Sequence, residues 1–453
     1  MKTYLYPTSR DAPRVSKNNG MRGSMLCVVL LFLVVFSILS VGLLKLASFN
    51  ATAAGKDISA SQAFWAAEAG IAQVCALAEK HATAPFESMA GMGTLPFVIT
   101  GTTLPGSGTP GTYSVHIDYD PTWPSTNYIK KYEIVSTGVS KGGDTRVVGL
   151  HAELWTFANY MHASHFEQTP DGDPIYFSGV DVVDGPVYVN GQINIWSTPT
   201  FTKLVRSAAT TVNYQNGGTA SVFKGGLGLS APLLDFQGLY SSDPVATVKA
   251  KAGLTLVGDY TLVFAADGTV AYTLTAGGGG GKPVTKALSS LNGAIYVNGN
   301  ASVSGVVNGT VTVVAEKSIY IPSSITYASA SGTNDPWRSS FNPAAVDDAL
   351  GLMARQRVEV GGTAAINIHA AIMVTGDAGG NSWGFNATNK VMSIGQPKLN
   401  VYGSIAQYRR GVVGYVSGLG FAKNYKYDSR FNSISPPWWP YSTYLFSNWR
   451  QGG

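Results

Sequence analysis

A short cluster of histidine and carboxylate residues is the first candidate for chemistry in this sequence. His162 and His165 form an H-x-x-H pair, and Glu167 and Asp171 follow closely. Imidazole and carboxylate groups are ligands that zinc prefers, and a helix could present both imidazoles to one ion. Most histidines at such a spacing are solvated loop residues. We therefore expect no metal site here.

Two aspartate pairs are the next candidates. Asp181 with Asp184, and Asp347 with Asp348, could supply the paired carboxylates that cleave glycosidic bonds. Acidic pairs more often cap turns or begin helices, and residues 349–354 after the second pair have a composition that favours a helix. No nucleophile with a base beside it can be identified. We expect no catalytic residues, no metal and no cofactor, and a protein that is not an enzyme.

The elements that must position these side chains begin with an apolar segment. Residues 25–44 carry no charge and lie between Arg22 and Lys45. As a helix, this run rises ~30 Å, which matches the hydrocarbon thickness of a bilayer. Basic residues outnumber acidic ones ahead of it, which predicts a cytoplasmic N-terminus and export of everything after Lys45.

An alanine-rich segment continues the helical pattern to about His81. Its most distinctive stretch consists of Phe64, Trp65, Ala66, Ala67, Glu68, Ala69 and Gly70. Alanine favours helix, and small residues let neighbouring backbones approach closely. Apolar residues at helical spacing form one face, made of Phe64, Trp65, Ile71, Val74, Leu77 and Ala78. We expect this face to contact both partner helices and the protein's own sheet.

The start of the chain resembles that of the type IV pilins, and in particular the PilX-type minor pilins. A short basic leader that ends in Gly20 or Gly23 is similar to their class III signal, and the alanine-rich block is similar to their AAEAG signature. The resemblance covers residues 20–80. Pilins usually carry a glutamate at the fifth mature position, whereas this chain has Met25 or Val28 there.

This resemblance implies how the protein would be processed and assembled. A prepilin peptidase would cleave on the cytoplasmic side, after Gly20 or Gly23, and leave Met21 or Ser24 as the new N-terminus. The helix would anchor the protein in the bacterial inner membrane and then join other pilin subunits in an extracellular filament or at the cell surface.

Two other interpretations of this segment remain open. An ordinary secretory signal could be removed at the small residues Ala51, Thr52 and Ala53, although the apolar stretch of such a signal is typically ~7 to 15 residues long. A plain membrane anchor without a filament role would need no alanine-rich block.

Charge and cysteine content exclude two further classes. Five of the 31 basic and one of the 26 acidic residues lie within residues 1–23, so 26 basic and 25 acidic residues remain beyond the leader. We therefore expect no nucleic-acid partner. Cys27 and Cys75 would lie ~70 Å apart on one helix, which is too far for a disulfide within the chain.

Three strands of alternating polarity follow a loop between His81 and about Pro110. They span residues 112–119, 131–137 and 145–155. A long helix whose second half is covered by such an antiparallel sheet is what the resemblance implies. We predict an α+β protein in which residues 1–23 are a cytoplasmic leader and residues 24–160 form a pilin-like unit.

The sequence beyond residue 160 repeats a short β pattern. The segment from Asp184 to Ile195 reappears from Asn292 to Val303, and similar runs continue to Ile405. Short strands without intervening helices stack most simply as rungs of a solenoid. We predict an irregular right-handed parallel β-helix in residues 161–453, with a β-sandwich as the alternative because Asn-Gly dipeptides also form hairpins.

Two parts of this unit depart from the repeat. Residues 203–290 differ in composition and are interpreted as an insertion. The C-terminal end is aromatic and includes Trp438, Trp439 and Trp449. Exposed aromatic side chains would suit a surface glycan or a protein partner, whereas buried ones would cap the open end of the solenoid.

Together these features predict a structural minor pilin that displays a large β-rich domain. The alternative is a membrane-anchored carbohydrate-binding or carbohydrate-active surface protein, for which the solenoid pattern and the terminal tryptophans argue.

Overall fold

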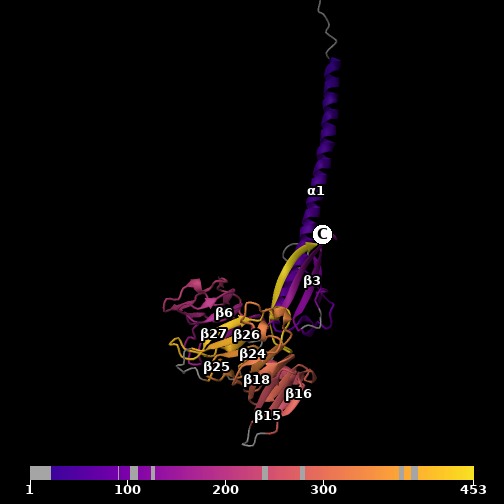
Figure 1. The fold of residues 1–453 in the computed structure, drawn as a ribbon. Coiled ribbons are helices and arrows are strands. Elements are labelled where there is room, and N and C mark those ends of the chain that lie inside the picture. Colours follow the sequence, from indigo (N-terminus) through magenta and orange to yellow (C-terminus); the bar gives the residue numbers. More distant parts are fainter. Residues whose placement is uncertain are drawn as a thin grey trace, which may run out of the picture.

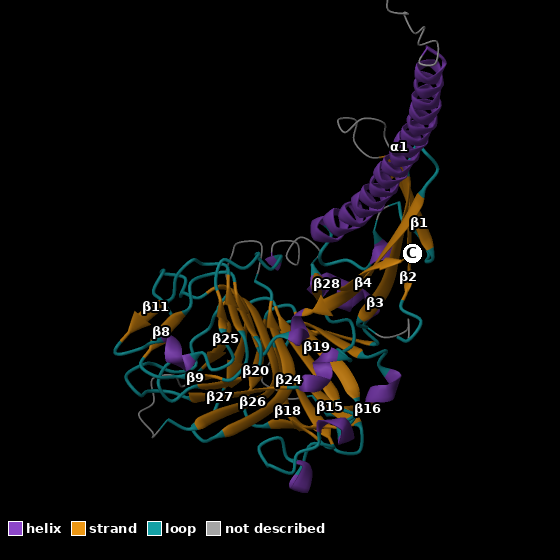
Figure 2. Cartoon of the chain, turned by 90° about the horizontal axis from the view of Figure 1, so that it is seen from above, coloured by secondary structure: helices purple, strands orange, loops and turns teal. Residues whose placement is uncertain are grey.

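The computed structural model describes residues 22–89, 91–102, 111–123, 128–236, 243–275, 281–376, 382–388 and 396–452. One long helix stands out from the molecule, an antiparallel sheet covers its second half, and a larger unit of mostly parallel strands follows (Figures 1 and 2). This arrangement agrees with the predicted α+β class.

Helix α1 (Arg22–Lys80) has two halves in different surroundings. The side chains of residues 25–50 are all exposed, and the segment is strongly apolar. Among the described residues, α1 is the one helix that is long and apolar enough to cross a membrane. Its second half packs on the sheet and ends within one residue of the predicted end at His81.

The sheet on α1 has five antiparallel strands. They are β1 (Phe97–Thr102), β2 (Thr112–Tyr119), β3 (Lys130–Val139), β4 (Thr145–Thr156) and β28 (Tyr441–Gly452). The three predicted strands are confirmed as β2, β3 and β4. Strand β1 lies where we expected only loop, because its short alternating run is flanked by glycine, proline and threonine residues.

Strand β28 returns residues near the C-terminus to the sheet on α1. It pairs with β4, so the last residues belong to the sheet on α1 (Figure 2) and not to the unit that we expected to extend to residue 453. The aromatic tail therefore does not simply cap the solenoid. Tyr444 lies in the core with Phe86 and Tyr132, and Trp449 Nε1 donates a hydrogen bond of 2.9 Å to Glu68.

Small residues form most of the buried face of α1. Buried positions are Ala63, Ala66, Ala67, Gly70, Ile71, Val74 and Ala78. Trp65, which we placed on the apolar face, is 64% exposed, and Phe64 and Leu77 are half-buried. The predicted face differs from the observed one because we located it from the large apolar side chains, whereas the small side chains are the ones that pack closely on the sheet.

Two glycines allow helix and sheet to touch. A Cβ added to Gly138 of β3 would lie 2.1 Å from the carbonyl oxygen of Ala63 and 2.3 Å from the amide nitrogen of Ala67. A Cβ added to Gly70 would lie 2.4 Å from the Ser136 hydroxyl oxygen. The AAEAG block therefore serves close packing on the chain's own sheet.

The larger unit consists mainly of parallel strands in three rows. The first row contains, in spatial order, β12 (Leu227–Gly228), β10 (Val205–Ser207), β7 (Val187–Val189), β5 (His162–Phe166), β26 (Lys398–Arg409), β24 (Ile366–Val374), β22 (Ala349–Ala354), β19 (Thr310–Ala315), β17 (Ala294–Asn298) and β13 (Leu254–Val257). All these pairs are parallel.

The other rows are shorter and share two long strands with the first, because β24 and β26 each continue from one row into another. One contains β9 (Thr200–Phe201), β6 (Val182–Asp184), β27 (Ala422–Tyr427), β21 (Ile325–Tyr327) and part of β18 (Ala301–Val307). The other contains β11 (Asn213–Gln215), β8 (Asn194–Trp196), β25 (Gly384–Ala387), β23 (Arg357–Val360) and β20 (Ser318–Ile321). A large apolar cluster draws its members from all three rows.

The chain enters this unit at its middle. From β5 it proceeds outward through β7 and β10 to β12, and from β13 it returns through β17, β19, β22 and β24 to β26, which pairs with β5. The connection between β12 and β13 includes helix α3 (Pro244–Lys251) and leads from one end of the unit to the other. The first and the last strands of the first row along the chain, β5 and β26, are therefore neighbours.

This path accounts for the interruption that we predicted at residues 203–290. Strands β10, β12 and β13 within it belong to the parallel rows. Among the described strands of this segment, only β14 (Tyr260–Ala265), β15 (Thr269–Leu274) and β16 (Val284–Ala287) pair antiparallel, and β14 also pairs in parallel with β18. The two copies of the sequence repeat contain β7 and β17. In the first row, β7 comes second after β5, and β17 comes second after β13.

Asp347 and Asp348 precede a strand, and the helix expected after them is wrong. All six residues of β22 are buried. A strand that is covered on both faces has no alternation, so its short apolar run cannot be told from a helical segment by periodicity.

Short 3-10 turns complete the described secondary structure. They are η1 (Phe86–Ser88), η2 (Phe157–Asn159), η3 (Ala220–Val222), η4 (Leu288–Ser290), η5 (Gly332–Asn334), η6 (Pro343–Ala345) and η7 (Ser429–Asn432).

Replacing Gly138 by alanine tests the close packing of α1 on the sheet. The new methyl group would overlap the α1 backbone, and we expect the free energy of unfolding to fall by ~1–3 kcal/mol. Thermal unfolding of the detergent-solubilised chain measures this. The control is Gly55→Ala on the exposed part of α1, which meets no atom within 4 Å and should leave stability equal or higher. Equal melting temperatures for Gly138→Ala and the wild type would contradict the packing argument.

Candidate functional site

The two histidines of the H-x-x-H pair lie on β5 and point in opposite directions. His162 is buried, and its ring contacts Phe177 in the interior of the parallel rows. His165 stacks on Tyr408, 5.0 Å between ring centres, and contacts Phe236 on the other side of the strand. An odd spacing on a strand separates the two imidazoles, so they cannot share a metal ion.

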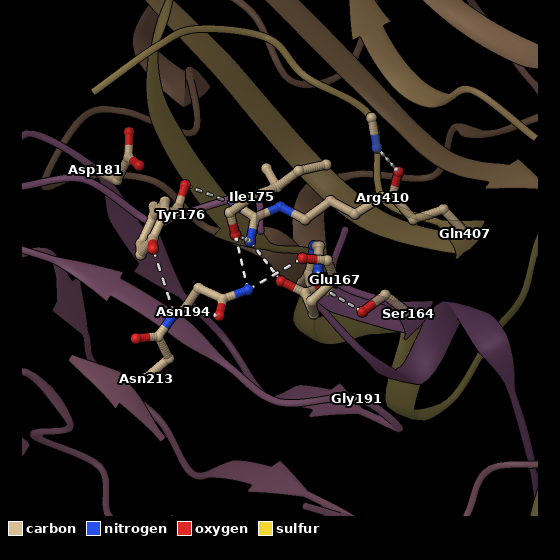
Figure 3. Close-up of polar contacts among 12 residues, drawn as sticks. Ser164, Glu167, Ile175, Tyr176, Asp181, Gly191, Asn194, Asn213, Gln407 and Arg410 are labelled. Atoms are coloured by element: carbon tan, nitrogen blue, oxygen red, sulfur yellow. Dashed lines mark hydrogen bonds and ion pairs between the residues drawn. The ribbon is translucent and has the colours of Figure 1, made fainter. Parts of the chain in front are cut away.

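Glu167 is the centre of a buried polar cluster, drawn in Figure 3. Its carboxylate accepts hydrogen bonds from the Ser164 hydroxyl, from His162 Nε2 at 3.0 Å and from Arg410 Nη1 at 2.5 Å. Arg410 also donates to the carbonyl oxygens of Ile175 and Tyr176, at 3.1 and 3.2 Å. Arg410 follows β26 and Glu167 follows β5, so this cluster bridges the two neighbouring strands β5 and β26.

A second buried ion pair spans the same boundary. Lys423 Nζ of β27 lies 2.7 Å from Asp181, which directly precedes β6, and both side chains are almost completely buried. Asp181 also accepts hydrogen bonds from the backbone amides of Ser178 and Lys423. We call the boundary between β5–β6 and β26–β27, with its two ion pairs, the junction.

The surroundings of these groups shift their pKa values. Burial alone would raise the pKa of Glu167, but the Arg410 charge and the bonds from His162 and Ser164 outweigh it and lower the pKa to about 2. Burial lowers the pKa of His162 and of Lys423. Glu167 is therefore an anion and His162 is neutral at pH 7, and the fixed anion is held by hydrogen bonds on both oxygens.

The other predicted carboxylates are also engaged in structure. Asp184 accepts a hydrogen bond from the Thr202 hydroxyl. Asp348 is buried and accepts bonds from the amides of Gly309 and Ser329 and from the Ser329 hydroxyl, whereas Asp347 is exposed. None of these contacts pairs two facing carboxylates.

The arrangement of possible metal ligands and the polar cavity near Glu167 add little further chemistry. Within the part of the chain that the structure describes, no group of three or more His, Cys, Asp and Glu side chains is arranged to hold a metal ion. A polar cavity of about 280 Å³ lies beside Glu167 and is lined partly by Gln168, Gln192, Asn194 and Asn213. The Asn194 amide donates to the Glu167 carbonyl oxygen at 3.0 Å and supports the turn at the cluster (Figure 3).

Of the predicted leader and helix residues, those that the structure describes lie on α1. Gly20 lies outside the described residues, and Gly23 lies in the first turn of α1. Ala66, Ala67 and Gly70 are buried against the sheet. Ala69, Glu68 and Phe64 are half-buried, and Phe64 meets Trp449 edge to face at 6.4 Å.

The three tryptophans have different environments. Trp439 is 3% exposed and packs in the core near Gly351, while Trp449 is 51% exposed beside α1. Trp438 is half-buried and lines a groove of about 650 Å³ between the sheet on α1 and the parallel unit. Sequence reasoning found these residues from composition but could not place this groove, because its walls come from distant segments.

Comparison with models of protein families, with curated proteins and with solved structures found no match for this chain.

Arg410→Met tests the junction. The change leaves the Glu167 carboxylate buried without its cation, and we expect a loss of ~3–5 kcal/mol in the free energy of unfolding. The matched control is the double variant Glu167→Gln with Arg410→Met, which removes both charges and should recover a large part of the loss. Denaturant titration of the full chain in detergent measures both. A double variant no more stable than the single one would contradict the ion-pair argument.

Acid should destabilise the protein in two steps. His162 is kept neutral by burial but is protonated below pH ~6.5 when unfolded, so stability falls as the pH drops below that value. Glu167 is ionised down to pH about 2 when folded, against 4.5 ordinarily, so a second loss occurs between these values. Melting temperatures from pH 7 to pH 3 measure the curve.

Two variants identify the residue that causes each loss of stability. His162→Phe should flatten part of the curve between pH 7 and 5, leaving the shares of His165, whose pKa burial also lowers, and of His369, whose pKa burial lowers to about 4. Glu167→Gln should flatten it below pH 4.5. Curves parallel to the wild type in both variants would show that other groups cause the acid sensitivity.

Proposed function

We propose that this chain is a minor-pilin-like component of a type IV pilus or a related filament, and that it displays a large β-rich part at the cell surface. The observation that carries the proposal is the division of α1. Residues 25–44 carry no charge, residues 25–50 are exposed throughout, and small residues farther along the helix are buried on the chain's own sheet. Such an exposed apolar half needs lipid or other helices around it.

The antiparallel sheet adds support. It covers only the second half of α1, as the resemblance to pilins implies, and leaves the first half free to move from the inner membrane into a bundle of pilin helices. Throughout that transfer the helix keeps its backbone hydrogen bonds and its apolar side chains out of water. The role is structural, and we assign no catalytic step to it.

We also propose that the parallel unit is an irregular, right-handed, three-sided β-helix. Its three rows of parallel strands, each visited in turn along the chain, favour this over a sandwich, whose hairpins pair antiparallel. An asparagine ladder is further support. Asn424 donates to Asn400 at 2.6 Å, and Asn400 donates to Asn367 at 2.8 Å, on adjacent strands in register.

A second candidate function is carbohydrate binding by the displayed part. The observation that favours it is the aromatic groove beside Trp438. This function is compatible with display on a filament or on a simple membrane anchor.

Mass spectrometry of the mature N-terminus tests the filament proposal. We expect a start at Met21 or Ser24, with α1 retained, because a prepilin peptidase would cleave after Gly20 or Gly23. A start at Ala54 would mean an ordinary secretory signal and would remove the apolar half of α1, which overturns the proposal.

A paired variant sharpens this test. Replacing both Gly20 and Gly23 by leucine should leave full-length precursor in the membrane and abolish incorporation into filaments. The control is Gly42→Leu within the apolar run, where a Cβ meets no atom within 4 Å and cleavage should be unaffected. Normal processing of the double glycine variant would refute cleavage at this boundary.

A further inference from the structure

The groove beside Trp438 is built from segments that are distant in the sequence. Its walls include residues just after α1, the beginning of β3, helix α3 and the segment before β28. Its volume of about 650 Å³ lies within the range of typical small-molecule sites, which often occur between structural units. It lies between the parallel unit and the sheet on α1.

Trp438 is held in a fixed and unusual position. Its φ of +59° lies in the left-handed region, which bulky residues rarely adopt and which is found preferentially at binding sites. The indole Nε1 donates to the Asn292 carbonyl oxygen at 3.0 Å, and the ring meets Tyr128 edge to face at 5.7 Å. These two contacts outweigh the cost of the strained backbone and hold the half-buried indole at the groove.

Charge on the groove has one sign. Lys130 and Lys251 line it, and no aspartate or glutamate is among the described residues that form its walls. Lys130 is partly compensated by Glu87, 3.9 Å away, but Lys251 is exposed and its Nζ lies 5.5 Å from the centre of the Trp438 ring. A ligand whose sugar ring contacts the Trp438 indole would therefore have a carboxylate within reach of the Lys251 ammonium group.

The lining also contains hydroxyl groups. Thr83, Ser88 and Thr247 stand among aromatic and proline side chains. Aromatic faces contact the apolar faces of sugar rings, hydroxyl groups bond to sugar hydroxyls, and an ammonium group binds a carboxylate. A ligand that uses all three features has apolar faces, many hydroxyls and negative charge.

We propose that this groove binds an acidic saccharide, with a sugar ring on Trp438 and its carboxylate at Lys251. The inference rests on the carbohydrate-binding candidate function and specifies its ligand class. It is independent of the filament proposal, because the groove residues are far from Gly20 and Gly23 in the sequence and take no part in cleavage of the leader.

The test is a calorimetric titration of the full chain in detergent with three acidic probes, oligogalacturonate, hyaluronan oligosaccharide and sialyllactose. We expect saturable binding of at least one of them. For oligogalacturonate, the methyl ester supplies the same sugar without charge, and we expect it to bind about tenfold more weakly. Binding of none of the three probes overturns the proposal, as does equal binding of an acidic probe and its uncharged form.

Variants locate the site. Lys251→Gln should weaken the acidic probe about tenfold and leave the ester unchanged, whereas Trp438→Ala should weaken both. The control is Lys249→Gln on the same helix, because Lys249 lies over Tyr296 and does not line the groove. If Lys251→Gln and Lys249→Gln bind the acidic probe equally well, the groove is not the site.

The mature N-terminus of each variant is measured in parallel. For the wild-type chain, a start at Met21 or Ser24 without binding of any probe would contradict the saccharide site alone, and a start at Ala54 with binding intact would contradict the filament proposal alone. The two proposals can therefore fail separately.

Discussion

The pairing of β5 with β26 determines the path of the whole chain. A parallel series that ended at either strand would leave a row of backbone groups unpaired inside the molecule, and such groups are costly when buried. By pairing, β5 and β26 satisfy each other. The chain must then enter and leave at the middle of the unit and cross its length once, between β12 and β13. The buried Glu167–Arg410 and Asp181–Lys423 pairs lie across this boundary, where a shifted register would leave each charge without a partner.

This path fixes the parallel unit to the helix through two connections. The segment after β4 leads into β5, and the segment after β27 leads back to β28, which pairs with β4. Because entry and exit are neighbours, β28 can complete the sheet on α1, place Tyr444 in its core and bring Trp449 to Glu68. A single linker would allow the two parts to move freely, whereas two strands in one sheet restrain them. The groove at Trp438 exists because the second connection passes between the parts.

Local patterns in the sequence predicted the local structure well. Three strands of the sheet and several of the parallel unit, such as β20 and β23, coincide with the alternating runs. The errors share one physical cause, because they concern contacts between distant segments. The buried β22 has no alternation, β28 has a partner almost 300 residues earlier in the sequence, and Trp65 is exposed because Ala66 and Ala67 pack closer to the sheet. The predicted insertion likewise contains the crossing between two ends of one unit, which no local pattern reveals.

The residues that first suggested chemistry are best understood through the same constraint. His162, Glu167 and Asp181 come from the first turns of the parallel unit, and their partners Arg410 and Lys423 come from its last turns. Two stacks of apolar rungs could slide past each other by two residues at little cost, since such a shift keeps the same side chains inside and the interiors are chemically alike. A charged pair and a buried imidazole remove that freedom, because only one register brings each donor to its acceptor. Their spacing in the sequence resembles that of a ligand set, but the Glu167 and Asp181 carboxylates face partners more than 200 residues later in the chain. This long-range match explains why such polar residues are buried in an otherwise apolar interior.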